Sequence, residues 1–355
     1  MSIWQWVHEF ARDASESGDD QRFQIYQLAL EASEYGKEDP ELNLATLNEG
    51  RALASQLNEP WWILFFDHWR LQNLLNYQRD FREVVEIAVT ATLEARKPIY
   101  AHFPQRICLH EDLITAYLGI DPLGYSNVIT EAMDYMKAEV PDDVECRFCA
   151  ESCRAEFALV CNDLDGAEKS ARRTLKMADE CETQSTSDHH GAAACGYLCT
   201  VSYRRQDWES LREWSDMGEE LNRKRDEDLG LATQLIWKAI LTRIHGDEDQ
   251  AKRIRHRAIS RVKRARSTPG ADYYDALCAF HEQGDELDKA LLVRERELAR
   301  ISGKGRLHDE CQIHLKRCRI LAKLGELSEE ALQEAREAAN RLRDPKPILA
   351  ELDQL

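Results

Sequence analysis

Residues 160–167 read Val160-Cys-Asn-Asp-Leu-Asp-Gly-Ala167, which is the apolar end of one helix, a short polar turn and the opening of a second helix. Four later segments share this shape: Ser202-Tyr-Arg-Arg-Gln-Asp-Trp-Glu-Ser-Leu211, Ile244-His-Gly-Asp-Glu-Asp-Gln-Ala251, His281-Glu-Gln-Gly-Asp-Glu-Leu-Asp-Lys-Ala290 and Lys323-Leu-Gly-Glu-Leu-Ser-Glu-Glu-Ala331. The residues that open the second helices stand at 167, 211, 251, 290 and 331, which are 44, 40, 39 and 41 positions apart. Self-similarity at a fixed period is typical of repeat proteins, so we infer a repeat of about 40 residues.

The same period extends toward the N-terminus. It places turns near positions 126 and 85, where Leu118-Gly-Ile-Asp-Pro-Leu-Gly124 and Tyr77-Gln-Arg-Asp80 supply them. A repeat of this length holds two helices of about 17 residues with two short connections, and no segment shows sustained period-two alternation. Apolar residues at three-and-four spacing, as in 81–93, give each helix a stripe that a single hairpin cannot bury. The hairpins are therefore expected to stack on one another.

We expect one all-α domain over residues 1–355. The predicted hairpins are 20–57, 60–96, 102–138, 143–181, 186–224, 228–265, 270–302 and 305–343. An N-terminal cap, 1–19, contains a helix over 3–17, and a C-terminal cap covers 344–355 because Pro345 and Pro347 mark the end of the last full helix. Caps of this kind cover the apolar faces that terminal repeats would otherwise expose.

Small residues recur at matched positions of the repeats. Twelve positions before Ala167, Leu211, Ala251 and Ala290 lie Ala155, Cys199, Ala239 and Cys278. This spacing resembles the tetratricopeptide repeat (TPR), in which small residues let the two helices of a hairpin pack closely. The period is longer than the family's usual 34 or so residues, and a regular Trp-Leu-Gly-Tyr signature is missing, so the resemblance is to a long-repeat relative. It implies a right-handed superhelical solenoid of about eight antiparallel hairpins, but it transfers no ligand-contact residues.

Composition and charge narrow the functional classes. The chain of 355 residues has 16 glycines and 9 prolines, and its formal net charge of −18 disfavours general nucleic-acid binding. The longest apolar run, residues 61–66, is far shorter than the roughly 20 residues that cross a bilayer. The first residues lack the basic start of a secretory signal. We expect a cytoplasmic protein.

The eleven cysteines lie in helix-patterned stretches and are interpreted as reduced thiols that pack as small apolar side chains. Cys146-x-x-Cys149-x-x-x-Cys153 is the nearest approach to a metal motif. On a helix, Cys146 and Cys153 are separated by about 10.5 Å of rise, whereas two thiolates on one zinc ion lie about 4 Å apart. We therefore expect packing rather than metal binding, although Cys146 and Cys149 alone could chelate an ion.

Few residues suggest catalysis. Asp188-His189-His190 follows Ser185-Thr186-Ser187 at an expected helix start, where Ser and Asp act as caps. Ser302-Gly303-Lys304-Gly305 is interpreted as a turn, because no phosphate-binding loop of the usual spacing is present. We expect no enzyme activity, no metal and no cofactor. A metal-dependent enzyme built on Cys146, Cys149, His189 and His190 remains as an alternative.

The most unusual charge feature is the segment 252–266, which holds eight basic residues and no acidic one. Its apolar positions keep helical spacing, so the basic side chains occupy the other faces. They either pair with acidic residues of adjacent hairpins or, through Arg255, Arg257 and Arg261, dock an acidic partner or less readily RNA. Aromatic residues at 62, 65, 66 and 69 are expected in the core, with Trp61 or Trp4 as a possible anchor for a partner.

These observations predict a non-enzymatic scaffold or adaptor whose stacked first helices form a groove for a peptide or protein segment. Candidate contacts are polar or aromatic residues on first helices: Asn73, Arg147, Arg154, Tyr203, Trp237, Tyr274 and Lys316. The alternative is a regulatory or sensor module that controls a partner on binding a ligand.

Overall fold

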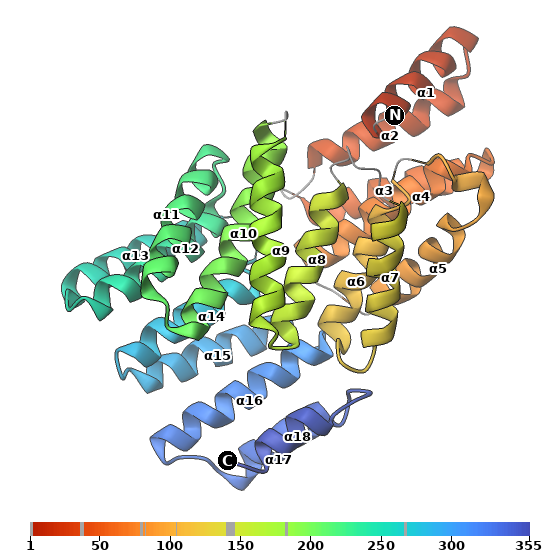
Figure 1. Cartoon of the computed structure of the whole chain (residues 1–355). Helices are drawn as coiled ribbons and strands as arrows, with labels where there is room; N and C mark the ends of the chain where they lie inside the picture. The colour runs from red at the N-terminus through yellow and green to blue at the C-terminus, as the bar shows by residue number, and fades with distance from the viewer. Residues whose placement is uncertain are drawn as a thin grey trace. The chain divides into compact units, whose positions relative to one another are not determined.

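The computed structural model describes residues 3–35, 39–78, 81, 83–103, 105–139, 146–181, 184–265 and 268–355. Within these ranges every regular element is a helix and no strand occurs, as the all-α prediction requires (Figure 1). The chain divides into two compact units. Unit 1 comprises Met1–Tyr117 and Asn127–Pro141, and unit 2 comprises Leu118–Ser126 and Asp142–Leu355. A single domain over 1–355 stays a prediction.

Unit 1 is built from short antiparallel helices. They are α1 (Ile3–Ser17), α2 (Asp20–Tyr35), α3 (Pro40–Gln56), α4 (Pro60–Gln72), the π-helix η1 (Asn73–Gln78), α5 (Val84–Ala95), the 3-10 helix η2 (Pro98–Tyr100), most of α6 (Cys108–Ile120) and α7 (Ser126–Glu139). Consecutive helices pack on each other from α1 to α5. Asp39 caps α3 by accepting a hydrogen bond from the Leu42 N–H at 3.0 Å, and Pro40 begins the helix with its fixed φ.

The core of unit 1 is aromatic. Trp62, Phe65 and Phe66 on α4 are buried, which confirms the stripe expected from their spacing. Trp69 at the end of the stripe is half-buried. The ring of Trp6 on α1 packs against Trp62 in a tilted arrangement, with 4.7 Å between ring centroids, while the capping role of the N-terminal helix stays a prediction. Trp61 is also half-buried, and its Nε1 donates to the Ile99 carbonyl, whereas Trp4 is 41% exposed.

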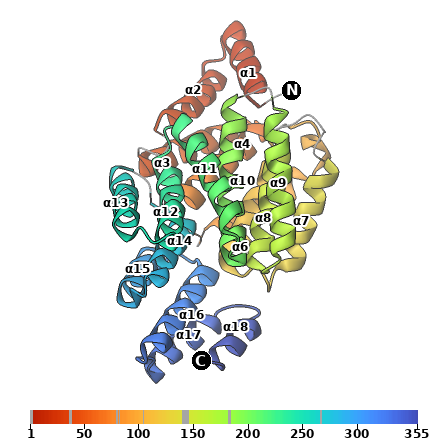
Figure 2. The same cartoon turned by 60° about the vertical axis from the view of Figure 1, so that its left-hand side comes forward.

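Besides Leu118–Ser126, the described residues of unit 2 form five hairpins and a final helix. The hairpins are α8 (Cys146–Val160) with α9 (Leu164–Asp179), α10 (Gln184–Arg205) with α11 (Trp208–Lys224), α12 (Asp228–Ile244) with α13 (Glu248–Arg264), α14 (Ala271–Gln283) with α15 (Leu287–Ile301), and α16 (Leu307–Leu324) with α17 (Glu329–Ala339). The last helix is α18 (Lys346–Leu352). The first helices α8, α10, α12 and α14 contact one another in succession, and α14 to α17 follow side by side (Figure 2). This is the packing of a helical repeat.

Three hairpin turns of unit 2, those before α9, α11 and α13, repeat one local geometry. A residue in the left-handed region, such as Asn162 at φ 57°, Gln206 at 59° or Gly246 at 87°, is followed by an aspartate that caps the next helix. These caps are Asp163, Asp207 and Asp247, whose carboxylates accept hydrogen bonds from the N–H three residues on at 2.9, 3.1 and 2.9 Å. The left-handed residue reverses the chain and the aspartate satisfies an orphan helix N–H, which explains the recurring sequence pattern.

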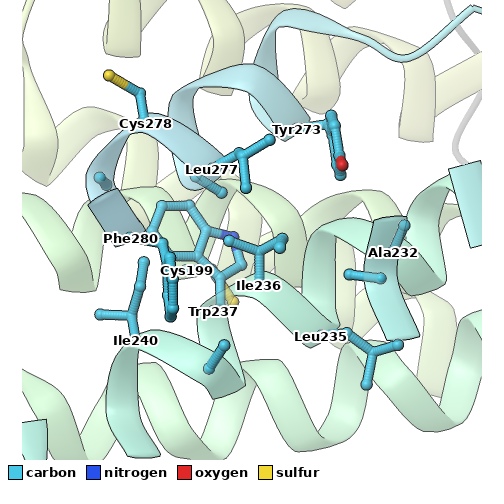
Figure 3. Packing of buried hydrophobic residues seen from close by; sticks show 14 of the residues in the cluster. Cys199, Ala232, Leu235, Ile236, Trp237, Ile240, Tyr273, Leu277, Cys278 and Phe280 are labelled. Atoms are coloured by element: carbon cyan, nitrogen blue, oxygen red, sulfur yellow. The ribbon is translucent and has the colours of Figure 1, made fainter. Parts of the chain in front are cut away.

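Small side chains fill the crossings between the helices of a hairpin. Ala155, Cys199, Ala239 and Cys278 are fully buried, as are the residues twelve positions after each of them. Burial raises the pKa of the Cys195, Cys278 and Cys311 thiols to about 12, so these cysteines stay protonated. Larger residues complete the core around α12, where Trp237 lies among Cys199, Ile240 and Phe280 (Figure 3).

The turn Leu118–Ser126 of unit 2 is tied to the segment after α17. The buried carboxylate of Asp121 accepts hydrogen bonds from the N–H groups of Gly124, Arg343 and Asp344 at 2.9, 2.7 and 3.0 Å. The Arg343 guanidinium lies 5.1 Å from the Tyr125 ring centroid. One side chain therefore joins segments more than two hundred residues apart.

We expect Asp121→Ala to lower the free energy of unfolding of unit 2 by about 2 to 3 kcal/mol, because three N–H groups lose a charged acceptor. Asp121→Asn keeps one acceptor oxygen and is expected to lose less. Urea denaturation followed by circular dichroism measures the effect. Asp353→Ala removes an exposed carboxylate near Arg336 and serves as the control. Equal effects of the two alanine variants would contradict the assigned role.

Candidate functional site

Unit 2 carries a groove of about 540 Å³ lined by α11, α12 and α13. The lining residues follow helical spacing on each element, which places them on one face. Those of α11 are Arg212, Ser215, Asp216 and Glu219; those of α12 and its end are Leu235, Lys238, Leu241, Thr242 and His245; those at the start and along α13 are Asp247, Gln250, Ile254 and Arg257. Two walls of the groove, α11 and α13, are second helices of their hairpins, and α12 is a first helix. The sequence had predicted a groove formed by first helices.

The acidic side chains of the groove already have partners. Lys238 of α12 reaches Asp216 at 2.6 Å and also pairs with Glu219, which in turn pairs with Arg223. Burial by itself lowers the pKa of Lys238, but the two carboxylates outweigh it and raise the pKa. The third acid, Asp247, caps α13 through the N–H of Gln250. The lysine is therefore charged and its carboxylates are neutralised.

The guanidinium groups of Arg212 and Arg257 lack a carboxylate partner among the described residues. Arg212 instead donates to His245 Nε2 at 2.9 Å, while His245 Nδ1 lies 2.6 Å from the Leu241 carbonyl oxygen. A carbonyl oxygen can only accept, so Nδ1 carries the proton and Nε2 is the acceptor for Arg212. His245 is consequently neutral in this arrangement. Both arginines are exposed and available to an anion.

Several predicted contact residues lie in the interior instead. Asn73, at the start of η1 in unit 1, is 1% exposed and donates to Asn43 Oδ1 at 2.6 Å and to the Pro40 carbonyl at 2.9 Å. Trp237 is 3% exposed in the core of unit 2. Tyr274 is buried, and its hydroxyl accepts a hydrogen bond from Arg300. These three side chains hold helices together and offer little surface to a partner.

The other predicted first-helix residues are half-buried on unit 2 and do not line the groove. Arg154 of α8 pairs with Glu151 at 2.5 Å, and Arg147 lies near the start of the same helix. Tyr203 of α10 packs against Trp237 at 5.3 Å. Lys316 of α16 pairs with Asp275 at 2.7 Å.

The basic residues of α13 support both interpretations of the segment 252–266: some pair with acidic residues of the chain, and others are open to a partner. Arg261 reaches Asp228 of α12 at 2.8 Å, so this residue pairs with an acid within its own hairpin. Arg255 lies 5.5 Å from the Phe280 ring centroid. Arg257 alone of the three predicted arginines lines the groove. Arg266, the last basic residue of the segment, lies outside the described residues.

The sequence did not identify Arg212, Lys238 and His245 as site residues. The lining residues as a set show three-and-four spacing on α11 and α12, but which basic side chain pairs with which acid depends on how the helices pack. The packing of the hairpins leaves Arg212 and Arg257 without an acidic partner among the residues that the structure describes.

The histidines of the alternative metal site make other contacts. The His190 ring stacks on Phe148 with centroids 4.4 Å apart, and His189 Nδ1 lies 2.7 Å from Arg225 Nη2. Burial lowers the pKa of His190 to about 3. In the part of the chain that the structure describes, no cluster of three or more His, Cys, Asp or Glu side chains could hold a metal ion. The side chain of Cys146 lies outside that part.

A second group of charges is buried between α14, α15 and α16. Arg294 lies 2.7 Å from Glu297 and 2.8 Å from Asp275, and Asp275 also binds Lys316. Glu297 is 4% exposed. Burial raises its pKa to about 7, even though Arg294 acts in the opposite direction. The cluster joins three consecutive helices and lies outside the groove.

The raised pKa of Glu297 predicts a pH effect. Between about pH 4.5 and 7 the folded protein holds a proton on Glu297 that the unfolded chain has lost, so this residue's contribution to stability falls as the pH rises through that window. We expect Glu297→Gln to match the wild type near the acidic end and to be more stable by about 2 to 3 kcal/mol near pH 8. Urea denaturation at several pH values measures the difference. Glu295→Gln on the exposed face of α15 is the control, and equal curves for both variants would contradict the prediction.

Within the described ranges, none of the helices combines the length and the apolarity needed to cross a bilayer. No protein-family model matches the chain, and no curated protein matches its sequence.

The chain is similar to solved structures, one of them with a TM-score above 0.5. The apo form of the quorum sensor NprR from B. thuringiensis matches with a TM-score of 0.57 and 13% sequence identity, over 95% of this chain and 93% of that one. A tetratricopeptide repeat protein from Parabacteroides merdae matches with a TM-score of 0.38 and 14% identity, over 88% of this chain and 98% of that one. Together with the paired helices and the small residues buried at their crossings, the likeness to the quorum sensor shows that this chain has the fold of the TPR-like helical repeat proteins.

Proposed function

We propose that this protein is a non-enzymatic scaffold or adaptor that binds a peptide or protein segment on its helical repeats. The observation that carries the proposal is the groove of unit 2, in which charged side chains border apolar ones. Two exposed guanidinium groups of this groove have no carboxylate partner in the described part of the chain. Repeat proteins present long continuous surfaces of this kind, and peptide recognition reuses such grooves. Of the predicted contacts, Arg257 belongs to the groove, and the half-buried Arg147, Arg154, Tyr203 and Lys316 remain candidates elsewhere on unit 2.

The test is direct binding between purified components. Proteins captured from a native lysate on the full chain are expressed separately, and the affinity of each for the purified chain is measured by calorimetry. We expect at least one partner to bind through a defined segment, which is mapped by truncation and then made as a synthetic peptide. Captured proteins that fail to bind when purified would overturn the proposal.

The fold of the quorum sensor supports a second candidate, a sensor module that controls a partner when it binds a ligand. A ligand that binds the folded state alone stabilises it by mass action, by about 2.7 kcal/mol at a hundredfold excess over its Kd. This candidate predicts that a peptide raises the Tm and changes the affinity for the protein partner. A peptide that binds without changing partner affinity favours the adaptor.

A further inference from the structure

We propose that the groove between α11, α12 and α13 binds an acidic peptide segment in which a carboxylate neighbours an apolar side chain. This inference rests on the proposed function and names the chemistry of its partner. It follows from the balance of charges inside the groove, from the apolar strip between those charges, and from the geometry of Arg212.

Two of the three basic side chains of the groove, Arg212 and Arg257, have no carboxylate partner among the described residues. Arg212 donates one N–H to the neutral His245, which is a weaker acceptor than a carboxylate. The other N–H groups of Arg212 stay available to a ligand. Arg257 stands on the opposite wall, on α13, without an ion-pair partner in the described chain. Guanidinium groups bind carboxylates through two parallel hydrogen bonds, so these arginines suit Asp or Glu side chains.

A cationic segment would find no equivalent site. Asp216 and Glu219 are held by Lys238, and Asp247 is held by the first turn of α13. A cationic ligand that took these carboxylates would leave the half-buried ammonium group of Lys238 without a counter-ion, and this costs free energy. The groove therefore favours negative charge at its two arginines, although its acidic and basic side chains are equal in number.

That equal number also argues against a polyanion. RNA carries a charge on every nucleotide, and its neighbouring phosphates would meet Asp216 and Asp247 as well as the two arginines. The formal net charge of −18 adds a repulsive field that opposes a polyanion more strongly than a peptide with one or two carboxylates. A peptide can place one or two carboxylates opposite the arginines and present uncharged residues elsewhere.

The apolar strip gives the expected neighbour of the carboxylate. Ile254 is half-buried on the α13 wall and supplies most of the accessible apolar surface, because Leu235 and Leu241 of α12, which also line the groove, are buried. An apolar side chain inserted here removes further apolar surface from water, at about 25 cal/mol per Å². Binding thus combines a charged contact for specificity with an apolar contact for affinity.

The experiment begins with a displayed library of random peptides of about twelve residues, selected on the full chain. We expect enrichment of sequences with Asp or Glu next to Leu, Ile, Val or Phe. An enriched peptide is labelled with fluorescein, and its Kd is measured by anisotropy. Replacing its acidic residues with Gln or its apolar residue with Ser is expected to weaken binding about tenfold or more, since a charged hydrogen bond contributes about 1.5 kcal/mol or more.

Charge reversal in the protein tests the site. The double variant Arg212→Glu/Arg257→Glu is expected to weaken binding of the acidic peptide at least thirtyfold or so, and to bind a matched peptide with Lys in place of Asp or Glu more tightly than the wild type does. Lys263→Glu makes the same charge change on an exposed face of α13 outside the groove and is expected to leave Kd within about twofold. Circular dichroism and urea denaturation confirm that each variant is folded.

The outcomes separate the two proposals. If no peptide is enriched and no purified partner binds, both the proposed function and this inference are wrong. If peptides bind but the double variant binds them as the wild type does, or if the enriched peptides lack acidic residues, the function stands and the groove assignment is wrong. If a single-stranded RNA probe binds more tightly than the peptides and the double variant abolishes that binding, the peptide proposal is overturned. Rescue by the lysine peptide supports it.

Discussion

Replacing Arg294 with methionine is expected to lower the free energy of unfolding of unit 2 by about 3 to 5 kcal/mol. The guanidinium lies in the interior between α14 and α15, where it binds Glu297 at 2.7 Å and Asp275 at 2.8 Å. Methionine retains most of the aliphatic stem and removes the charge. The loss of stability therefore measures how much the guanidinium stabilises the two carboxyl groups. Lys316 continues to neutralise Asp275, whereas Glu297 loses the cation that lowers its pKa and has to take up a proton to stay buried.

Urea denaturation at neutral pH, followed by circular dichroism, measures this loss. Arg296→Met on the exposed face of the same helix is the control and is expected to change stability by less than about 0.5 kcal/mol. The double variant Arg294→Met/Glu297→Leu removes the stranded carboxyl as well and is expected to recover part of the loss. If Arg294→Met lowered the free energy of unfolding by less than about 1 kcal/mol, the charged cluster would contribute little to the packing of these helices.

Truncating Trp237 to alanine is expected to lower the free energy of unfolding of unit 2 by about 3 to 5 kcal/mol. Trp237 lies on α12, the first helix that contacts both α10 and α14, and its ring packs on Tyr203 of α10 at 5.3 Å and lies near Phe280 of α14 (Figure 3). Removing the indole leaves a cavity among three helices that cannot collapse without shifting the repeat.

Thermal and urea unfolding measure the effect, and Trp237→Phe is expected to lose less because it refills part of the cavity. Leu292→Ala, at an apolar position of α15 that is 43% exposed, is the matched truncation and is expected to cost under about 1 kcal/mol. Similar losses for Trp237→Ala and Leu292→Ala would show that the packing around α12 is loose. A normal fold with weakened peptide binding would instead place Trp237 at the binding surface, as the sequence predicted.

Hairpin positions could be predicted because their signals are local. The expected hairpin 228–265 corresponds to α12 (Asp228–Ile244) and α13 (Glu248–Arg264), and the expected helix 3–17 corresponds to α1. A left-handed residue and a capping aspartate act within a few positions of the chain, so the turn at Gly246-Asp247 follows from its own residues. The π-helix η1 was not predicted, since nothing in its composition distinguishes it from a continuation of α4.

Contact residues were harder to predict because first helices are covered on more than one side. In α12 eleven side chains are buried, among them Trp237, Gln234 and Arg243. A helix enclosed in this way has no single polar face, so an aromatic or polar residue on it cannot be assigned to a free surface from periodicity. The assignment of Trp237 and Tyr274 to a groove assumed that a first helix is buried on one face and free on the other.

By itself the sequence determined the class of the fold, the repeat length and the small residues at the helix crossings, because turn chemistry and helical spacing act between neighbours in the chain. The tertiary structure decided which charges remain unpaired. Arg261 meets Asp228, 33 positions away, and Arg257 on the same helix meets no acid in the described chain. Ion pairing depends on distances of a few ångströms between separate helices, and only their packing sets those distances.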